Sequence, residues 1–500
     1  MTALFSLGSR IGKLKKDQSG SVAMLLAVSA IPIVLAAGVA VDYGNASQVQ
    51  AHLQTATDAA ALAAGREANK TATELETIAR RYFDSNYATQ ENAPQPTMSL
   101  SIDANGYIKI SSQVNVKNYL TSIAGYEYTN VKASAQVQKD ANGLEVVLVF
   151  DNTGSMANQS RLSTLKVAAR DFVNILFGPR ETADTLKIGV VPFSQFVNVG
   201  PDKSDKAWLD KSGLNPYSKA NFTNTNWHNW KAWNQISNRS WTGCVESRAG
   251  ALSVSDAPAD INNGATLFPP AFAPDEPGDS NFNNDAYISV GGTTVRYKNN
   301  YLADSSTTSV EARQMHQAKY KNASVTTTSR GPDLGCNIQP IMALNNVKQP
   351  ILNTLEAMQA SGYTHVAEGV GWGLRVLSSA EPFTEGVPYS EDKITKAMVL
   401  LTDGENTFNT NTISSNHNGS TYTAYGYLKQ ARLGSANYNT AIAAQNTLLA
   451  QACNNVKAEK IVVYSFAYNV PSATQRTLIK NCASSPEKYF DPPTNAALVK

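Results

Sequence analysis

Val146–Phe150, with the sequence VVLVF, runs directly into DNTGS at Asp151–Ser155, and this stretch decides the expected fold. An unbroken apolar run rich in β-branched residues is typical of a strand that is buried on both faces, as in a parallel sheet covered by helices. A second such run, Met398–Leu401, leads to Asp403. Acidic residues at both strand ends predict an α/β domain in which two carboxylates meet at the ligand-binding edge of the sheet.

Hydroxyl side chains accompany these carboxylates. Asp151, Thr153 and Ser155 share one motif, Thr364 lies in SGYTHVAEG, and Asp403 lies in LLTDGEN. Carboxylate and hydroxyl oxygens are hard donors that suit Mg²⁺, or Mn²⁺ or Ca²⁺ in its place, and Mg²⁺ usually keeps some water ligands. We therefore expect one metal site, with an exchangeable coordination position that can accept a carboxylate from a partner molecule.

A simpler interpretation exists for each motif taken alone. Asp, Thr and Ser are also the preferred N-caps of a helix that follows a strand. The order of the three motifs along the chain, each at a strand end or a helix start, favours the metal site over separate caps.

The three motifs resemble the von Willebrand factor A family, whose metal-ion-dependent adhesion site (MIDAS) reads D-x-S-x-S, then Thr, then Asp. The resemblance implies that Asp151, Thr153 and Ser155 fill the first motif, Thr364 the second and Asp403 the third. Thr153 replaces the commoner serine and keeps the hydroxyl group. The resemblance also implies a Rossmann-like domain at residues 144–500 that binds an acidic residue of a protein ligand.

Apolar runs alternate with helical patterns over this region, which predicts a doubly wound parallel sheet. The expected strands are 146–150, 186–193, 397–402 and 461–467 with an antiparallel return at 196–199, and the expected helices are 160–176, 350–359, 366–377, 439–457 and 472–481. Two insertions interrupt the domain, at about 200–339 and 405–433. We expect the tryptophans of the first to pack in a core, with a sugar- or peptide-binding platform as the alternative. The polar composition of the second allows a disordered spacer.

Ser21–Val41 carries no charged residue and as a helix would be about 30 Å long, enough to cross the core of a bilayer. Basic residues stand at positions 10, 13, 15 and 16, whereas none occurs from Asp42 to Gly65. The positive-inside rule then predicts a transmembrane helix at 21–41 in a bacterial inner membrane. Residues 1–20 would be cytoplasmic, and the bulk of the chain would lie in the periplasm or at the cell exterior. A cleaved signal peptide is the alternative.

Residues 42–140 predict a helix that continues to about Phe83 and then a small antiparallel sheet, with alternating apolar residues on both sides of the turn dipeptide Asn105-Gly106. Together with QSGSVAMLLAVSAIPIVLAAGVAVDYGNASQVQAHLQTATDAAALAA, this region resembles the TadE/TadG-like proteins of the tight-adherence (Flp) pilus assembly system. Joined to an A-type domain, the chain resembles the TadG-like members. This resemblance implies a membrane-anchored protein whose partners are pilus-assembly proteins.

The cysteines Cys244, Cys336, Cys453 and Cys482 are even in number, in a chain expected to leave the cytoplasm, so disulfides are permitted. Three pairings are possible. Cys453 lies near the end of one expected helix and Cys482 just past the next, which favours a local bridge and leaves the other two cysteines to brace the first insertion. Buried free thiols are the alternative.

The chain has 42 basic and 40 acidic residues, so its balance of charges gives no positive electrostatic field that would attract nucleic acid. None of the five histidines shares a motif with a Ser, Cys or Asp nucleophile, and His365 beside Thr364 is the one candidate base near the expected metal. We therefore expect a non-enzymatic protein of pilus assembly. A free-standing surface adhesin and an exported metal-dependent enzyme or enzyme subunit are the alternatives.

Overall fold

The computed structural model describes residues 19–67, 71–87, 95–103, 107–138, 143–183, 185–278, 281–282, 284–304, 309–410 and 415–499. The chain divides into two compact units, Met1–Asn142 and Gly143–Lys500, and each has its own apolar core. Most of the predicted cytoplasmic segment and the predicted turn at Asn105-Gly106 lie outside the described residues.

Two helices form the first part of unit 1, α2 (Ser19–Gly65) and α3 (Ala72–Tyr87). The prediction of one helix up to Phe83 is wrong, because a new helix starts after Thr71. The Thr71 amide donates to the Glu74 carboxylate over 2.9 Å, and the Glu74 amide donates to the Thr71 hydroxyl over 3.4 Å. Such a reciprocal pair caps the start of a helix. Within the described residues, no helix combines the length and apolarity that a membrane span requires.

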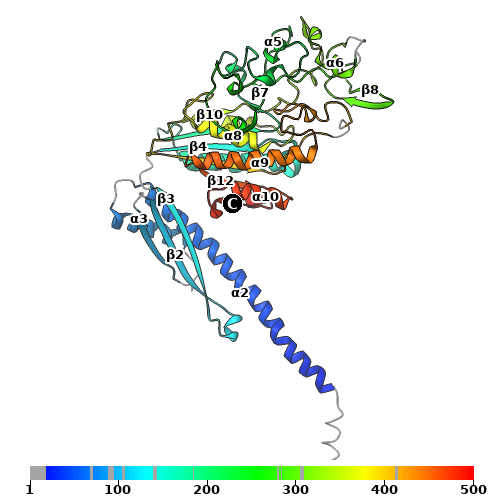
Figure 1. Ribbon diagram of the computed structural model, residues 1–500. Coiled ribbons are helices and arrows are strands. Elements are labelled where there is room, and N and C mark those ends of the chain that lie inside the picture. The colour runs from blue at the N-terminus through cyan, green and yellow to red at the C-terminus, as the bar shows by residue number, and fades with distance from the viewer. Residues whose placement is uncertain are drawn as a thin grey trace, which may run out of the picture. The chain divides into compact units, whose positions relative to one another are not determined.

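A three-stranded antiparallel sheet completes unit 1, in the order β1 (Thr97–Ile102), β2 (Tyr107–Lys117) and β3 (Tyr128–Gln138). The short 3₁₀ helix η1 (Thr121–Ala124) lies in the connection between β2 and β3. Alternate residues of the strands are buried with α2 and α3, as the sequence alternation predicts. In Figure 1 the sheet lies along the C-terminal half of α2.

Unit 2 is built on a six-stranded sheet in the order β10-β5-β4-β11-β12-β13. Its strands are β4 (Gly143–Asp151), β5 (Leu186–Phe193), β10 (Met342–Asn345), β11 (Ile394–Thr402), β12 (Val462–Ala467) and β13 (Tyr489–Phe490). All neighbours are parallel except β10, which pairs antiparallel with β5.

The sequence predicts an antiparallel return at 196–199. That prediction is wrong, because the antiparallel edge strand is β10. In that segment, β6 (Val197–Asn198) pairs with β7 (Cys244–Val245) in a separate small sheet. The apolar residues there are buried by the first insertion, which is a tertiary contact that local periodicity does not encode.

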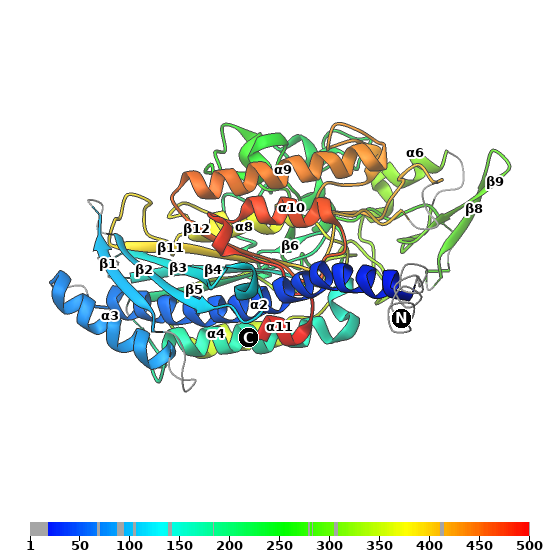
Figure 2. The ribbon, with the colours of Figure 1, turned by 90° about the horizontal axis from the view of Figure 1, so that it is seen from below.

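Helices cover both faces of the sheet, as a doubly wound fold requires. One face packs against α4 (Arg161–Phe177), α7 (Lys348–Ala357) and α11 (Asn495–Val499), and the other against α8 (Val366–Leu377), α9 (Tyr438–Ala458) and α10 (Ala473–Cys482). Figure 2 shows α9 and α10 on one side of β11, and α4 with α11 on the other. In β4, Val147 and Val149 face the core with α8, α9 and α10, and Leu148 faces the core with α4 and α7, which explains the unbroken apolar run.

The first insertion consists mostly of loops around a core of aromatic residues. Its regular elements beyond β6 and β7 are α5 (Asn229–Trp233), β8 (Ala286–Val290), β9 (Thr293–Tyr297) and α6 (Val310–Met315). Short 3₁₀ helices in unit 2 are Gly154–Ser160, Pro201–Lys203, Pro216–Lys219, Gly250–Val254, Gly264–Thr266, Gln317–Tyr320, Leu428–Gln430 and Pro486–Lys488. Trp208, Trp233 and Trp241 are buried, and Trp227 and Trp230 pack against the same core. The expectation that these tryptophans form a core is confirmed.

The second insertion is not a disordered spacer where the structure describes it. Tyr422, Tyr425 and Tyr427 are buried, and the Tyr422 hydroxyl bonds to the buried carboxylate of Glu246 in the first insertion. Arg432 donates to the same carboxylate over 2.6 Å. Some of its polar side chains thus bond to the other insertion, so its polar composition does not mean that the segment is solvated.

Two disulfides, Cys244–Cys336 and Cys453–Cys482, use all four cysteines. They are the pairs that the sequence analysis favours. The first joins the interior of the large insertion to its C-terminal end, and the second joins α9 to the end of α10.

Candidate functional site

Asp151 is the last residue of β4, and its carboxylate is completely buried. One carboxylate oxygen, Oδ1, accepts a hydrogen bond from the Thr153 amide over 2.9 Å. The other, Oδ2, accepts one from the Thr402 hydroxyl at the end of β11 over 2.6 Å. The two neighbouring strands thus hold the side chain in one orientation.

Ser155 connects the first motif to the third. Its hydroxyl oxygen lies 3.0 Å from that of Thr153, and the hydroxyl donates to Oδ1 of Asp403 over 2.6 Å. Asp403 directly follows β11 and is 2% exposed. Because β4 and β11 are parallel neighbours, their carboxyl ends bring two segments together that are about 250 residues apart in the sequence.

Thr364 lies just before α8, in a loop that is bound to the first motif. The Ser361 amide donates to the Asn152 carbonyl over 2.8 Å, and the Gly154 amide donates to the Gly362 carbonyl over 3.0 Å. The Thr364 and Ser155 hydroxyl oxygens lie 3.5 and 3.9 Å from the point where a Cβ on Gly404 would stand. The structure therefore brings all five predicted residues to the same edge of the sheet, around a glycine that leaves space between them.

The electrostatics of this cluster favour a bound cation. Burial and the charge of Asp403 raise the pKa of Asp151 to about 7, so two buried carboxylates repel each other here. One positive group is already present, because Arg161 Nη1 donates to Asp403 Oδ2 over 2.7 Å. No cation contacts Asp151 among the described residues.

The donor set fits a small hard cation. Two carboxylates and three hydroxyls supply only oxygen atoms, which is the chemistry that Mg²⁺, Mn²⁺ and Ca²⁺ prefer. Across the described part of the chain, no group of three or more His, Cys, Asp or Glu side chains is arranged to hold a metal. The cluster at Asp151 and Asp403 is not a group of that kind, since it has only two carboxylates and its remaining donors are hydroxyls.

His365 does not serve as a base at this site. Its ring packs between Phe408 and Tyr425, with centroids 5.2 Å from each, and Nε2 lies 3.2 Å from the Thr407 carbonyl. Burial lowers its pKa to about 3. The imidazole therefore belongs to the packing between α8 and the second insertion rather than to the carboxylate cluster.

Sequence reasoning missed Arg161 and Thr402. Thr402 had a signal, since it directly precedes Asp403 at the end of an apolar run. Arg161 had none, because a basic residue in the first turn of a helix is more often solvated than paired with a carboxylate.

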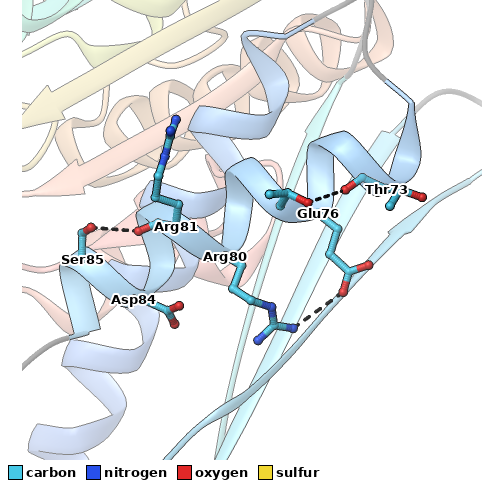
Figure 3. Close-up of a pocket in the computed structure, with 7 residues that line it drawn as sticks. Thr73, Glu76, Arg80, Arg81, Asp84 and Ser85 are labelled. Atoms are coloured by element: carbon cyan, nitrogen blue, oxygen red, sulfur yellow. Dashed lines mark hydrogen bonds and ion pairs between the residues drawn. The ribbon is translucent and has the colours of Figure 1, made fainter.

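A separate surface hollow of about 550 Å³ lies in unit 1, and Figure 3 shows the residues that line it. All seven come from α3, and they include an ion pair between Glu76 and Arg80 at 3.6 Å. A surface lined by one amphipathic helix, with its charges exposed, carries no ligand-binding chemistry of its own.

Comparison with known proteins adds a family match in unit 1. Residues 20–67 match the Tad family, described as "Putative Flp pilus-assembly TadE/G-like". No curated protein matches the chain.

Several solved structures resemble the chain distantly. The pilus adhesin SpaC from Lactobacillus rhamnosus GG is 13% identical with a TM-score of 0.29, over 82% of this chain and 34% of that one. The vWF domain of the type V pili tip protein Mfa5 from Porphyromonas gingivalis is 9% identical with a TM-score of 0.31, over 72% and 93%. The pilus adhesin RrgA from Streptococcus pneumoniae is 10% identical with a TM-score of 0.33, over 81% and 48%. The chain thus spans about a third of SpaC, and such low scores do not establish a shared function. What the comparisons do establish is that this chain carries a TadE/G-like pilus-assembly region at residues 20–67.

Proposed function

We propose that this chain is a membrane-anchored, non-enzymatic protein of Flp (tight-adherence) pilus assembly that binds a protein partner through a divalent cation. The family match at residues 20–67 supports the pilus-assembly role. The partner would present an acidic side chain, as expected from the A-type motifs. Unit 2 would face the periplasm or the cell exterior.

The observation that supports the proposed metal site is the buried pair of carboxylates, Asp151 and Asp403, with hydroxyl groups around it. Asp151, Thr153, Ser155, Thr364 and Asp403 would hold Mg²⁺, or Mn²⁺ or Ca²⁺ in its place. When bound, such an ion supplies an exchangeable coordination position for an external carboxylate. Within the protein, Thr402 and the Thr153 amide orient Asp151, and Ser155 and Arg161 orient Asp403.

Metal binding can be tested on the purified full chain in detergent after treatment with a chelator. Calorimetric titration with Mg²⁺, Mn²⁺ and Ca²⁺ should detect one site, and an ion at about 100 times its Kd should stabilise the fold by about 2.7 kcal/mol. Asp151→Asn and Asp403→Asn should lose both effects and still fold, because an amide keeps the shape and removes the repulsion. The control is Asp171→Asn, an exposed change on α4, which should bind like the parent. Unchanged binding in both site variants would show that the cluster is not a metal site.

Anchoring is supported by the exposed apolar side chains of α2. Val28, Ile33, Val39 and Val41 are all more than half exposed on this helix, in the stretch that carries no charge. Exposed apolar side chains of this kind are favoured in lipid rather than in water. Protease added to spheroplasts should digest unit 2 and leave an N-terminal tag intact. If unit 2 is protected and the tag is digested, the proposed orientation is wrong and the chain crosses the membrane in the opposite direction.

The partner class can be tested by co-purification with the other Flp pilus-assembly proteins of the same cell. We expect them to elute together in Mg²⁺, and separately in chelator or from the Asp151→Asn chain. A free-standing adhesin would instead keep its surface binding in a strain that lacks those proteins.

A further inference from the structure

The connection between β2 and β3 exposes an unusual number of large side chains. We define the hairpin tip as residues 118–128, with the sequence NYLTSIAGYEY. Tyr119, Ile123, Tyr126 and Tyr128 are 69%, 78%, 71% and 58% exposed. Glu127 is the one charged residue among them. Several large apolar side chains that are exposed within one short segment are typical of an interaction site.

The hairpin tip is held in a defined position against α2. The buried carboxylate of Asp42 accepts hydrogen bonds from the amides of Tyr119, Leu120 and Thr121 over 2.9, 3.1 and 2.8 Å, and from the Thr121 hydroxyl over 2.8 Å. One helical turn away, a Cβ on Gly38 would lie 2.8 Å from the Leu120 side chain. Absence of a side chain at Gly38 therefore lets the tip approach the helix closely.

This attachment places the hairpin tip at one end of the uncharged helical segment. Asp42 directly follows Val41, the last residue of the uncharged run. Figure 1 shows the β2–β3 connection beside the middle of α2, and beyond it the helix continues without the sheet. Tyr43, next to Asp42, is 74% exposed as well. Several exposed tyrosines and one exposed isoleucine thus lie near the point of the helix where the uncharged run ends.

We infer that the hairpin tip docks onto the lipid bilayer, with its tyrosines at the headgroup level and Ile123 among the upper acyl chains. The inference rests on the anchoring proposed above. Tyrosine is enriched at membrane interfaces because its ring is apolar and its hydroxyl is polar. Residues 118–126 contain no charged side chain whose removal from water would oppose docking. The Asp42 hydrogen bonds make the docked tip a second contact that sets the depth and tilt of the helix.

A single fluorescent label can test this inference. The two disulfides together use all four native cysteines, so a single introduced cysteine is the one free thiol that the label can modify. Ile123→Cys places the label on the tip, and Tyr107→Cys places it at the far end of β2, a strand about 33 Å long. The full chain is reconstituted in vesicles that contain lipids with a nitroxide on the upper acyl chain. We expect at least threefold stronger quenching at position 123 than at position 107.

Flotation of the same vesicles separates the two proposals. If the chain does not float with the vesicles after alkaline extraction, the anchor is wrong and the docking with it. If it floats and both labels are quenched equally weakly, the anchor stands and the docking is wrong. Emission that shifts with protein density but resists lipid quenching would mean contact with a second copy, which also overturns lipid docking.

A substitution at Asp42 provides an independent check. Asp42→Asn keeps the size of the side chain but weakens its hydrogen bonds to the tip, so the quenching at position 123 should fall towards that at position 107. Flotation should not change. Full quenching in this variant would show that Asp42 does not position the tip.

Discussion

At the scale of single residues, Arg161 gives the carboxylate cluster a fixed positive charge on Asp403, while Asp151 has none. The proposed cation site therefore keeps a net negative charge, and Arg161 reduces the attraction of that charge for a cation. The Arg161 side chain is only 15% exposed, so water screens its charge poorly.

We predict that Arg161→Gln binds Mg²⁺ about tenfold more tightly, because a positive charge beside the dication is removed. When a chelator has removed the metal, the free energy of unfolding of the same variant should be about 1.5–3 kcal/mol lower, which is the typical contribution of a hydrogen bond to a charged group. Calorimetric titration and thermal unfolding measure the two effects. Arg170→Gln, on the same helix with an exposed partner, should change neither. Equal metal affinity in parent and Arg161→Gln would show that the arginine does not influence the site.

Because Asp42 can be protonated, the attachment of the hairpin tip to α2 should depend on pH. Hydrogen bonds led by that of the Thr121 amide hold the pKa of Asp42 at about 2, below the ordinary value of 3.8. A depressed pKa stabilises the folded contact above the unfolded value, and this contribution is lost as pH falls from about 4 towards 2. We predict that a label at position 123 becomes more mobile over this range, as measured by fluorescence anisotropy. The Asp42→Asn chain should be mobile at every pH, and an identical transition in that variant would assign the change to another group.

At the scale of elements, the two disulfides stabilise unit 2 to different extents. The chain-entropy relation gives about 3.6 kcal/mol for the separation of 29 residues in Cys453–Cys482 and about 4.6 kcal/mol for the 92 residues in Cys244–Cys336. We predict that replacing the pair 244 and 336 by serine lowers the free energy of unfolding more than replacing 453 and 482. Urea unfolding of the two double variants checks the order. The reverse order would mean that the unfolded insertion retains structure that shortens its effective loop.

The second insertion shows how an element can be misjudged from composition. Tyr422 and Arg432 both bond to Glu246, which belongs to the first insertion. The two insertions therefore supply each other with hydrogen-bond partners and share an apolar core. A polar, asparagine-rich sequence is ordered when another segment satisfies its donors and acceptors.

At the scale of the whole molecule, each unit has a separate core. The core of unit 1 is formed by α2, α3 and the three-stranded sheet, and Leu53 is fully buried in it. We predict that Leu53→Ala destabilises unit 1 by about 2–5 kcal/mol through the cavity it leaves. The Mg²⁺-dependent unfolding of unit 2 should stay unchanged, which scanning calorimetry with and without Mg²⁺ can measure. A shift of both transitions by the same amount would show that the units unfold together.

The sequence by itself determined four strands of the large sheet in unit 2, β4, β5, β11 and β12, and the acidic residues at the ends of β4 and β11. Runs such as Val146–Phe150 are apolar at every position, and a strand is the short element that can be covered on both faces. Asp151 and Asp403 could be placed together because parallel strands end at the same edge. Alternation at residues 98–102 and 131–137 likewise determined the small sheet, since a strand with one buried face has a period of two.

Only the tertiary structure decided the rest. The edge strand β10 joins β5 across an insertion of more than a hundred residues, so no local pattern distinguishes it from the segment at 196–199. The order of the second insertion depends on partners such as Glu246, and the charge of the site depends on Arg161, whose position is set by the start of α4. Periodicity reports which face of an element is buried, whereas polar partners are chosen by distances between segments that meet only when the chain is folded.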